Sequence, residues 1–308
     1  MRMTHSAWVI VWVSVLVPGA SVCAQSFPTK PIRILAAEAG GSTDFTIRIM
    51  AQGISGPLGQ PVIIENRTPY QGVEIVARAQ PDGYTLLCAG NAMWLLPLMR
   101  GNIISDKAFT PITIMTVAPQ VLLINPSLPA KSVRELIALA KARPGVLNYS
   151  SSNPGGPSHL AGELFNAMAG VNIVRVGYRS TTAAGIALIG GETQVTFLSV
   201  STSFPHIKSG KARALAITSA QPSPLTPDLP TIAASGLPGY ELLNILGTFA
   251  MAKTPPAIIR KLNQEMVRVL SQDDVRQKFL SVGVEAVGGP PEKLGALIKQ
   301  DIGRMGKV

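Results

Sequence analysis

Strand-like and helix-like segments alternate along most of this 308-residue chain, and this alternation constrains its fold more than any other feature. The apolar runs at 31–37, 61–66 and 84–90 have the length of buried strands, and residues 43–54 and 73–79 repeat apolar side chains with helical spacing. Such alternation is typical of proteins in which parallel strands are connected by helices. The sequence therefore predicts an α/β fold with mainly parallel sheets.

The same alternation continues in the second half of the chain. A helix is predicted after Ser132, which has Glu135 at capping-box spacing, and it should end at Pro144. The apolar segment 112–125 is predicted to form two runs broken at Ala118 and Pro119. Further extended segments are expected at 146–152, 172–178, 193–200, 213–218 and 241–252, and further helices at 159–169, after Pro255 and after Pro290.

The first 24 residues have the composition of a secretory signal peptide. Arg2 precedes an apolar run of about eleven residues, and Val22 and Ala24 occupy the −3 and −1 positions for cleavage after Ala24. The run is shorter than the roughly 18 residues of a membrane-spanning helix. A lipoprotein signal with Cys23 as the lipidated residue is the alternative, although Val22 is bulky for such a site. We therefore expect a periplasmic protein.

The charge and the cysteine content exclude further classes of function. Cleavage after Ala24 would leave 26 basic and 17 acidic residues, a net charge of +9, but the basic residues are scattered and form no run of five. This pattern argues against nucleic-acid binding, while a positive field favours the approach of anions. Cleavage would also leave Cys88 as the only cysteine, which excludes an internal disulfide. We expect Cys88 to be a buried apolar residue rather than a nucleophile.

Two glycine-rich junctions between a predicted strand and a predicted helix are candidate ligand sites: "AAEAGGSTDF" at 36–45 and "YSSSNPGGPSHLAGELF" at 149–165. In open α/β sheets, ligands bind beyond the carboxyl ends of the strands, where helix N-termini attract anions. Neither junction matches a dinucleotide-binding or P-loop motif. Together they predict one small anion held between two lobes. The alternative is that both are ordinary turns and that Asp44 only caps its helix.

The motifs "GQPVIIENR", "PDGYTLL", "PSHLAGELF", "PHIKSGKARALAIT" and "LPTIAASGLPGYE" follow one another along the chain. From about Phe27 to the C-terminus, the sequence resembles the Bug, or TctC-like, extracytoplasmic solute receptors of tripartite tricarboxylate transporters. The resemblance implies a two-lobed periplasmic-binding-protein fold of the Venus flytrap, type II-like kind, with two mainly parallel sheets joined by crossover segments. Lobe one would comprise residues 25–124 and 248–308, and lobe two residues 125–247.

The resemblance also implies a function and a set of binding residues. The partners would be a small organic carboxylate and integral-membrane transporter subunits, with no nucleic acid, and the receptor would be a monomer without cofactor, metal ion or catalytic residue. The ligand-binding residues would be Gly40, Gly41, Ser42, Thr43, Asp44, Gly90 and Asn91 in lobe one, and Ser150, Ser151, Gly155, Gly156, Ser158, His159, Tyr178, Arg179, Ser180, Thr181 and Ser199 in lobe two.

Several positions depart from the family pattern. Tyr70, Trp94 and Leu198 make the rim of the presumed cleft bulkier or more apolar, and Glu38 adds an acid near it. These changes lead to the hypothesis that the ligand is an aromatic or branched carboxylate, larger and more apolar than citrate. The alternative is that Tyr70 and Trp94 only pack against neighbouring loops.

Three functions other than transport have to be considered for a chain of this kind. An enzyme is disfavoured, because Ser158 and His159 are adjacent on a predicted helix and point apart, and because no hydrolase, metalloprotease or Cys-x-x-Cys motif is present. A ligand-sensing repressor domain would need a DNA-binding segment where the chain has a predicted signal peptide. An exported sensor that presents a carboxylate to a sensor kinase remains open.

Overall fold

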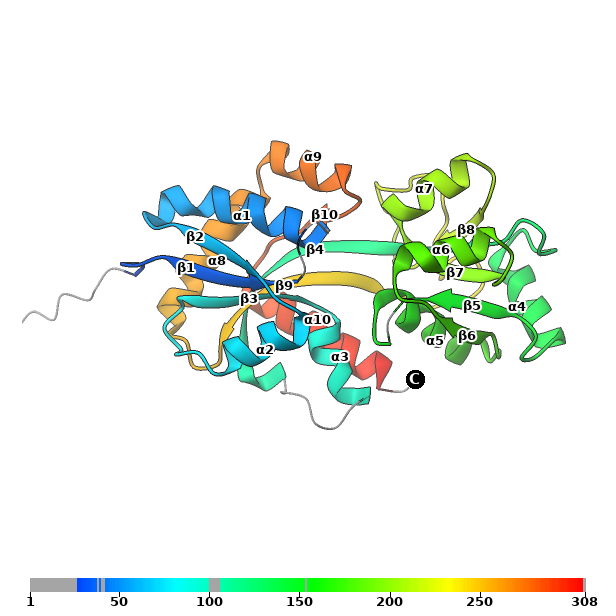
Figure 1. Cartoon of the computed structure of the whole chain (residues 1–308), viewed down its shortest axis with the longest axis horizontal. Helices are drawn as coiled ribbons and strands as arrows, with labels where there is room; N and C mark the ends of the chain where they lie inside the picture. Colours follow the sequence, from blue (N-terminus) through cyan, green and yellow to red (C-terminus); the bar gives the residue numbers. More distant parts are fainter. Residues whose placement is uncertain (1–26, 38, 40–41, 100–105, 153, 307–308) are drawn as a thin grey trace, which may run out of the picture.

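The computed structural model describes residues 27–37, 39, 42–99, 106–152 and 154–306. Two α/β lobes lie along the long axis of the molecule and are connected by two long strands, β4 (Phe109–Ile124) and β9 (Leu243–Met251) (Figure 1). This arrangement confirms the predicted two-lobed α/β fold. Within the described residues, no helix has the length and apolar character needed to cross a membrane.

Lobe one is built around three parallel strands, in which β1 pairs with β2 on one side and with β3 on the other. The strands alternate with helices in the order that the hydrophobic pattern predicts. Its elements are β1 (Ile32–Ala36), α1 (Ser42–Leu58), β2 (Val62–Asn66), α2 (Pro69–Ala77), β3 (Thr85–Gly90), α3 (Ala92–Met99), the 3-10 turn η1 (Asp106–Ala108), α8 (Pro256–Leu270), α9 (Asp273–Ser281), β10 (Glu285–Ala286) and α10 (Pro291–Met305).

Lobe two has the same construction, with β5 parallel to both β6 and β7. Its strands also alternate with helices. The elements are α4 (Val133–Ala142), β5 (Asn148–Ser151), α5 (Pro157–Ala169), β6 (Val174–Gly177), α6 (Thr181–Ile189), β7 (Val195–Ser199), α7 (Val200–Lys208) and β8 (Arg213–Ile217).

The crossing segments are themselves strands, and they make the sheet continuous between the lobes. The strand order is β2-β1-β3-β9-β4-β7-β5-β6, with β8 and β10 also paired with β4. The crossing strands pair antiparallel with β3, with each other and with β7, so each lobe combines a parallel part with an antiparallel part. The predicted lobe boundary at residue 124 coincides with the end of β4, and that at 247 falls within β9; both boundaries stay predictions.

The predicted break of the apolar segment at Ala118 and Pro119 is wrong, because β4 continues through both residues. Residues 109–119 pair with β9, and residues 120–124 pair with β7. Pro119 therefore lies where the strand changes its sheet partner. A proline lacks the N–H that a ladder requires, and this position is one where a strand can accept that loss.

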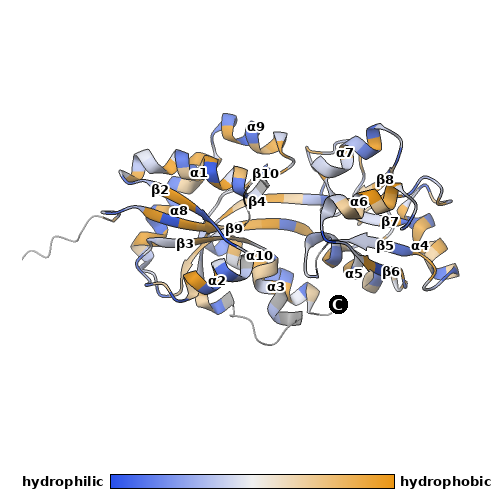
Figure 2. Ribbon diagram, in the orientation of Figure 1, coloured by the Kyte–Doolittle hydropathy of each residue, from blue (hydrophilic) through white to orange (hydrophobic). Residues whose placement is uncertain are grey.

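The helices of lobe one cover the sheet with the apolar faces that the sequence predicts. Ile47, Met50 and Ile54 of α1 are fully buried, and the stripe that includes Leu262 and Met266 of α8 packs in the same cluster. Figure 2 shows hydrophobic residues along much of β4 and β9, the strands at the centre of the molecule. Burial of these faces fixes the helices against the sheet and holds their N-termini at its edge.

The predicted capping of α4 is confirmed in its main contact. The Ser132 hydroxyl accepts a hydrogen bond from the backbone N–H of Glu135 at 3.2 Å. The Glu135 carboxylate reaches back to the N–H of Lys131 at 2.8 Å rather than to that of Ser132. Both contacts satisfy N–H groups at the start of the helix.

Candidate functional site

The strand directions place the carboxyl ends of the two sheets opposite each other. Strand β4 runs from lobe one into lobe two, and β3 has the same direction because both pair antiparallel with β9. Strands β1 and β2 are parallel to β3, so all three end toward lobe two. Strand β7 is antiparallel to β4, and β5 and β6 are parallel to β7, so these three end toward lobe one (Figure 1).

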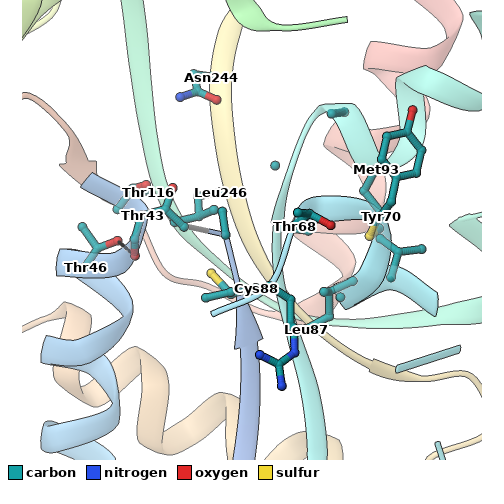
Figure 3. Close-up of a pocket in the computed structure, with 18 of the residues that line it drawn as sticks. Thr43, Thr46, Thr68, Tyr70, Leu87, Cys88, Met93, Thr116, Asn244 and Leu246 are labelled. Carbon is teal, nitrogen blue, oxygen red and sulfur yellow. Dashed lines mark hydrogen bonds between the residues drawn. The ribbon is translucent and has the colours of Figure 1, made fainter. Parts of the chain in front are cut away.

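A cavity of about 150 Å³ lies at this edge of lobe one (Figure 3). Three helices begin around it, since Thr43 lies in the first turn of α1, Thr68 precedes the first residue of α2, and Met93 lies in the first turn of α3. Helix N-termini present unpaired N–H groups and partial positive charge. The cavity is therefore suited to an anion at its helix-lined rim.

Two polar side chains of the crossing strands also line the cavity. Thr116 of β4 is 3% exposed, and its hydroxyl makes no hydrogen bond with any residue that the structure describes. Asn244 of β9 is half-buried, and its side-chain amide likewise has no partner among the described residues. A hydroxyl or amide that faces a cavity without a protein partner is satisfied by water or by a ligand. Both side chains are therefore available to a ligand.

The cavity contains one charged residue among the described lining, and that charge is already paired. The guanidinium of Arg67 donates to the Glu65 carboxylate and to the backbone oxygen of Asn66. In the described lining, the positive charge that is not already paired is therefore the partial charge of the helix N-termini.

Cys88 also lines the cavity and is 3% exposed, which confirms the expectation that it is buried. Burial raises the pKa of its thiol to about 12, because the apolar surroundings disfavour the thiolate. The thiol is therefore protonated at neutral pH and acts as a small apolar residue.

The structure places some of the predicted lobe-one residues at the cavity and gives others a structural contact. Thr43 and Gly90 line the cavity. Asp44 is buried and accepts hydrogen bonds from Arg48 Nε at 3.0 Å and from Asn66 Nδ2 at 2.9 Å. Glu38, Gly40, Gly41 and the side chain of Ser42 lie outside the part that the structure describes.

Asn91 is buried in a polar network next to the cavity. Its Nδ2 donates to the backbone oxygen of Leu243 at 3.1 Å and to Asp301 Oδ2 at 2.8 Å, and its Oδ1 accepts from the N–H of Ile245 at 2.7 Å. These contacts hold the backbone on both sides of Asn244. The side chain of the predicted binding residue Asn91 therefore forms its hydrogen bonds within the protein, to the crossing strand β9 and to Asp301.

Trp94 does not lie on the rim of the cleft, so its predicted place there is wrong and it gives no support to the hypothesis of an apolar ligand. The indole is 1% exposed, donates its Nε1–H to Asp301 Oδ2 at 2.8 Å and packs against Phe249. Leu198 is also fully buried, in the core of lobe two. Tyr70 is exposed and does line the cavity. Of the three departures that predicted an apolar rim, the structure supports only Tyr70.

The predicted lobe-two residues lie at the facing edge of that lobe, and none of them lines the lobe-one cavity. Most of their side chains have partners within the lobe. The Ser150 hydroxyl donates to Ala184 O, Ser151 accepts from Arg175, Ser158 accepts from the N–H of Ser152, Tyr178 donates to Glu192, and Ser180 and Ser199 cap α6 and α7. Gly155 has φ +76°, Gly156 is the N-cap of α5, Arg179 is exposed, and Thr181 begins α6.

The contacts of His159 agree with the argument against a serine nucleophile. Its Nδ1 accepts a hydrogen bond from the N–H of Gly155 at 2.9 Å, so in the neutral ring the proton lies on Nε2. Burial, and then the charge of Arg175, lower the pKa of His159, which favours this neutral form. Among the described residues, His159 and Ser158 share no hydrogen bond, as expected for neighbours on a helix.

Five polar residues of the described cavity lining were not predicted as binding residues: Thr46, Arg67, Thr68, Thr116 and Asn244. The sequence around Thr68 could have indicated a helix start, because Thr68 precedes a proline at the first position of α2. Thr46 follows Thr43 by three residues and so lies on the same side of α1. Thr116 and Asn244 had no local signal, since each lies within a long apolar strand.

The fold and the cavity define a protein of the periplasmic-binding-protein class, with two α/β lobes whose strands end at a shared interface. Residues 46–308 match the sequence profile of the tripartite tricarboxylate transporter family receptors, TctC, and the chain belongs to this family. The family consists of solute receptors rather than enzymes.

Individual relatives agree with this assignment. BugT of Bordetella pertussis is 31% identical over an alignment of 319 positions, which covers 100% of this chain and 97% of BugT. The structure of Rpa4515 from R. palustris with adipate has a TM-score of 0.74 at 31% identity and covers 90% of this chain and 95% of its own. The structure of MatC from Rhodopseudomonas palustris with bound malate has a TM-score of 0.75 at 28% identity and covers 91% of this chain and 99% of the MatC chain.

Proposed function

We propose that this protein is a periplasmic solute receptor that binds a small organic carboxylate between its lobes and delivers it to the membrane subunits of a tripartite tricarboxylate-type transporter. The observation that carries the proposal is the lobe-one cavity, where the first turns of α1, α2 and α3 converge. The lobes would be residues 25–124 with 248–308 and residues 125–247. The predicted N-terminal signal peptide supports export to the periplasm.

The carboxylate would lie at the rim of the cavity that faces lobe two. Backbone N–H groups at the helix N-termini and the hydroxyls of Thr43 and Thr116 would donate to its oxygens. Lobe two would contribute donors from its own facing edge, where α5, α6 and α7 begin. The carboxylate ligands of Rpa4515 and MatC support this class of ligand.

A thermal-shift screen of small carboxylates with the protein lacking residues 1–24 tests the proposal. A ligand that binds only the folded state stabilises it by RT ln(1 + [L]/Kd), about 2.7 kcal/mol at a hundredfold excess over Kd. Ala92→Leu adds three carbon atoms to a residue that lines the cavity, and it should abolish the shift. Ala79→Leu, outside the described cavity, is the matched control and should bind as the wild type does.

Two results would contradict this function. One is the absence of a shift with every carboxylate in the panel, at concentrations up to several millimolar. The other is an equal shift in wild type and Ala92→Leu, which would mean that the ligand binds elsewhere.

A further inference from the structure

The chemistry of the cavity wall is uneven, and this restricts the ligand that can occupy it. In Figure 3, Thr43, Thr46 and Thr116 lie together on one side, and Leu87 and Cys88 lie below the space between this group and Met93. Further apolar residues of the lining are Ala36, Val73, Ala89, Ala92, Leu246 and Val284. Arg67, Thr68 and Tyr70 also line the cavity, but they are exposed, whereas Leu87, Cys88 and Met93 are buried. The buried part of the wall away from α1 is therefore largely apolar.

From this distribution we infer that the ligand is a monocarboxylate with a compact, branched or cyclic apolar body, rather than a di- or tricarboxylate. The inference rests on the proposed function, since it assigns the ligand class of the same site. The carboxylate would lie at the rim near Thr43 and Thr116, and the apolar body would lie against Leu87, Cys88 and Met93.

The polar groups of the cavity suffice for one carboxylate. The Thr46 hydroxyl already donates to the backbone oxygen of Thr43 at 3.0 Å, so its proton is not available to a ligand. Thr43 and Thr116 retain their hydroxyl protons for a ligand, because neither makes a side-chain hydrogen bond with the described residues. Together with N–H groups at the helix N-termini they can occupy the two oxygens of a single carboxylate.

A second carboxylate placed against the buried, apolar part of the wall would have no comparable partner. The guanidinium of Arg67, the one cation of the described lining, is exposed and already donates to Glu65 and to the backbone of Asn66, whereas Leu87 and Met93 are buried. Against Leu87 and Met93, an ionised group would lose its hydration without gaining a hydrogen bond. An apolar group in the same place is instead favoured, because it removes apolar surface from water.

The volume of the cavity agrees with an apolar body of about six carbon atoms. A cavity of about 150 Å³ is the size at which a protein interior lined by apolar side chains takes up benzene. Each buried methylene strengthens binding about fourfold, so that affinity depends strongly on the body up to this size.

The test compares ligands of equal shape. An isopropyl group has nearly the shape of a carboxylate, so 4-methylpentanoate matches succinate and 6-methylheptanoate matches adipate. By isothermal titration with the protein lacking residues 1–24, we expect the monocarboxylate of each pair to bind at least tenfold more tightly. Straight-chain monocarboxylates from acetate to hexanoate should gain about fourfold in affinity per methylene until the cavity is full.

A pair of variants connects the preference to the cavity wall. Met93→Gln keeps the length of the side chain but adds an amide to the apolar wall, so it should reduce the preference for the monocarboxylate about tenfold. Met251→Gln makes the same change in a half-buried residue of β9 outside the described lining, and it should leave the preference unchanged.

The outcomes separate this inference from the proposed function. Tighter binding of succinate or adipate, or equal binding within each pair, would overturn the apolar-body assignment while supporting a carboxylate receptor. Binding of no carboxylate at all would overturn the proposed function and the inference together. An equal loss of preference in Met93→Gln and Met251→Gln would show that the preference does not arise at this wall.

Discussion

Replacement of Asn91 by alanine tests how the cavity is held in place. The side chain makes three buried hydrogen bonds, to Leu243 O, Ile245 N and Asp301 Oδ2. Asn91→Ala leaves a carbonyl and an N–H of the crossing strand without partners, and it removes one of two donors from a buried carboxylate. Each such loss costs about 1–3 kcal/mol, and partial entry of water lowers the sum, so we expect a total of about 3–5 kcal/mol.

The assay has a stability part and a binding part. At about 2–4 °C per kcal/mol, the melting temperature of Asn91→Ala should fall by roughly 10 °C. Carboxylate affinity should also fall, measured by titration well below that temperature, because Asn244 lies between the two backbone positions that Asn91 holds. Asn263→Ala is the matched control: it removes hydrogen bonds to Ile112 O and Gly289 O and should lower stability without changing affinity.

A charged variant of the same size adds a pH dependence. Asn91→Asp places a second carboxylate next to Asp301, in place of an amide nitrogen that now lies 2.8 Å from Oδ2. Two carboxylates at this distance cannot both be ionised without cost, so the variant should be least stable at neutral pH and recover as acidification protonates one of them. Wild-type stability in Asn91→Ala would refute the network argument, and wild-type affinity in that variant would refute its positioning role.

Three further predictions follow from the described contacts. Burial raises the folded-state pKa of Asp301, so folding favours its protonated form. In urea unfolding, the wild type should therefore gain stability relative to Asp301→Asn as the pH falls from neutral. A difference in stability that does not change with pH would contradict this. Thr116→Val should weaken carboxylate binding about tenfold by titration, whereas Thr110→Val on the same strand should not. Gly162→Ala should lower the melting temperature by several degrees, because its Cβ would lie 2.3 Å from the ring of Tyr149.

The parts of the fold that depend on neighbouring residues were predictable from the sequence. The buried faces of α1 and α8 follow from 3.6-residue periodicity, and the start of α4 follows from Ser132 and Glu135. The burial of Cys88 follows from its apolar strand. Each of these features requires information from only one helix or strand.

The cavity was predictable only in part, because its wall comes from segments that are distant in the sequence. The glycine-rich junction led to Thr43, but Thr116 and Asn244 reach the same cavity from two different strands. Trp94 was misplaced for the same reason, since the partner of its indole, Asp301, lies 207 positions away. A local pattern contains no information about such a partner, and buried hydrogen bonds decided the position of this aromatic residue.

The crossing strands β4 and β9 both connect the lobes and contribute side chains to the wall of the cavity. Thr116 and Asn244 belong to the strands that connect the lobes, and both lie close to Pro119, where β4 exchanges β9 for β7 as its partner. A ligand bound to these two side chains contacts the connection itself as well as the lobe-one wall. Such a ligand shifts the relative orientation of the lobes only to the extent that it binds one orientation more tightly than another, and contact with the connecting strands is one source of that difference.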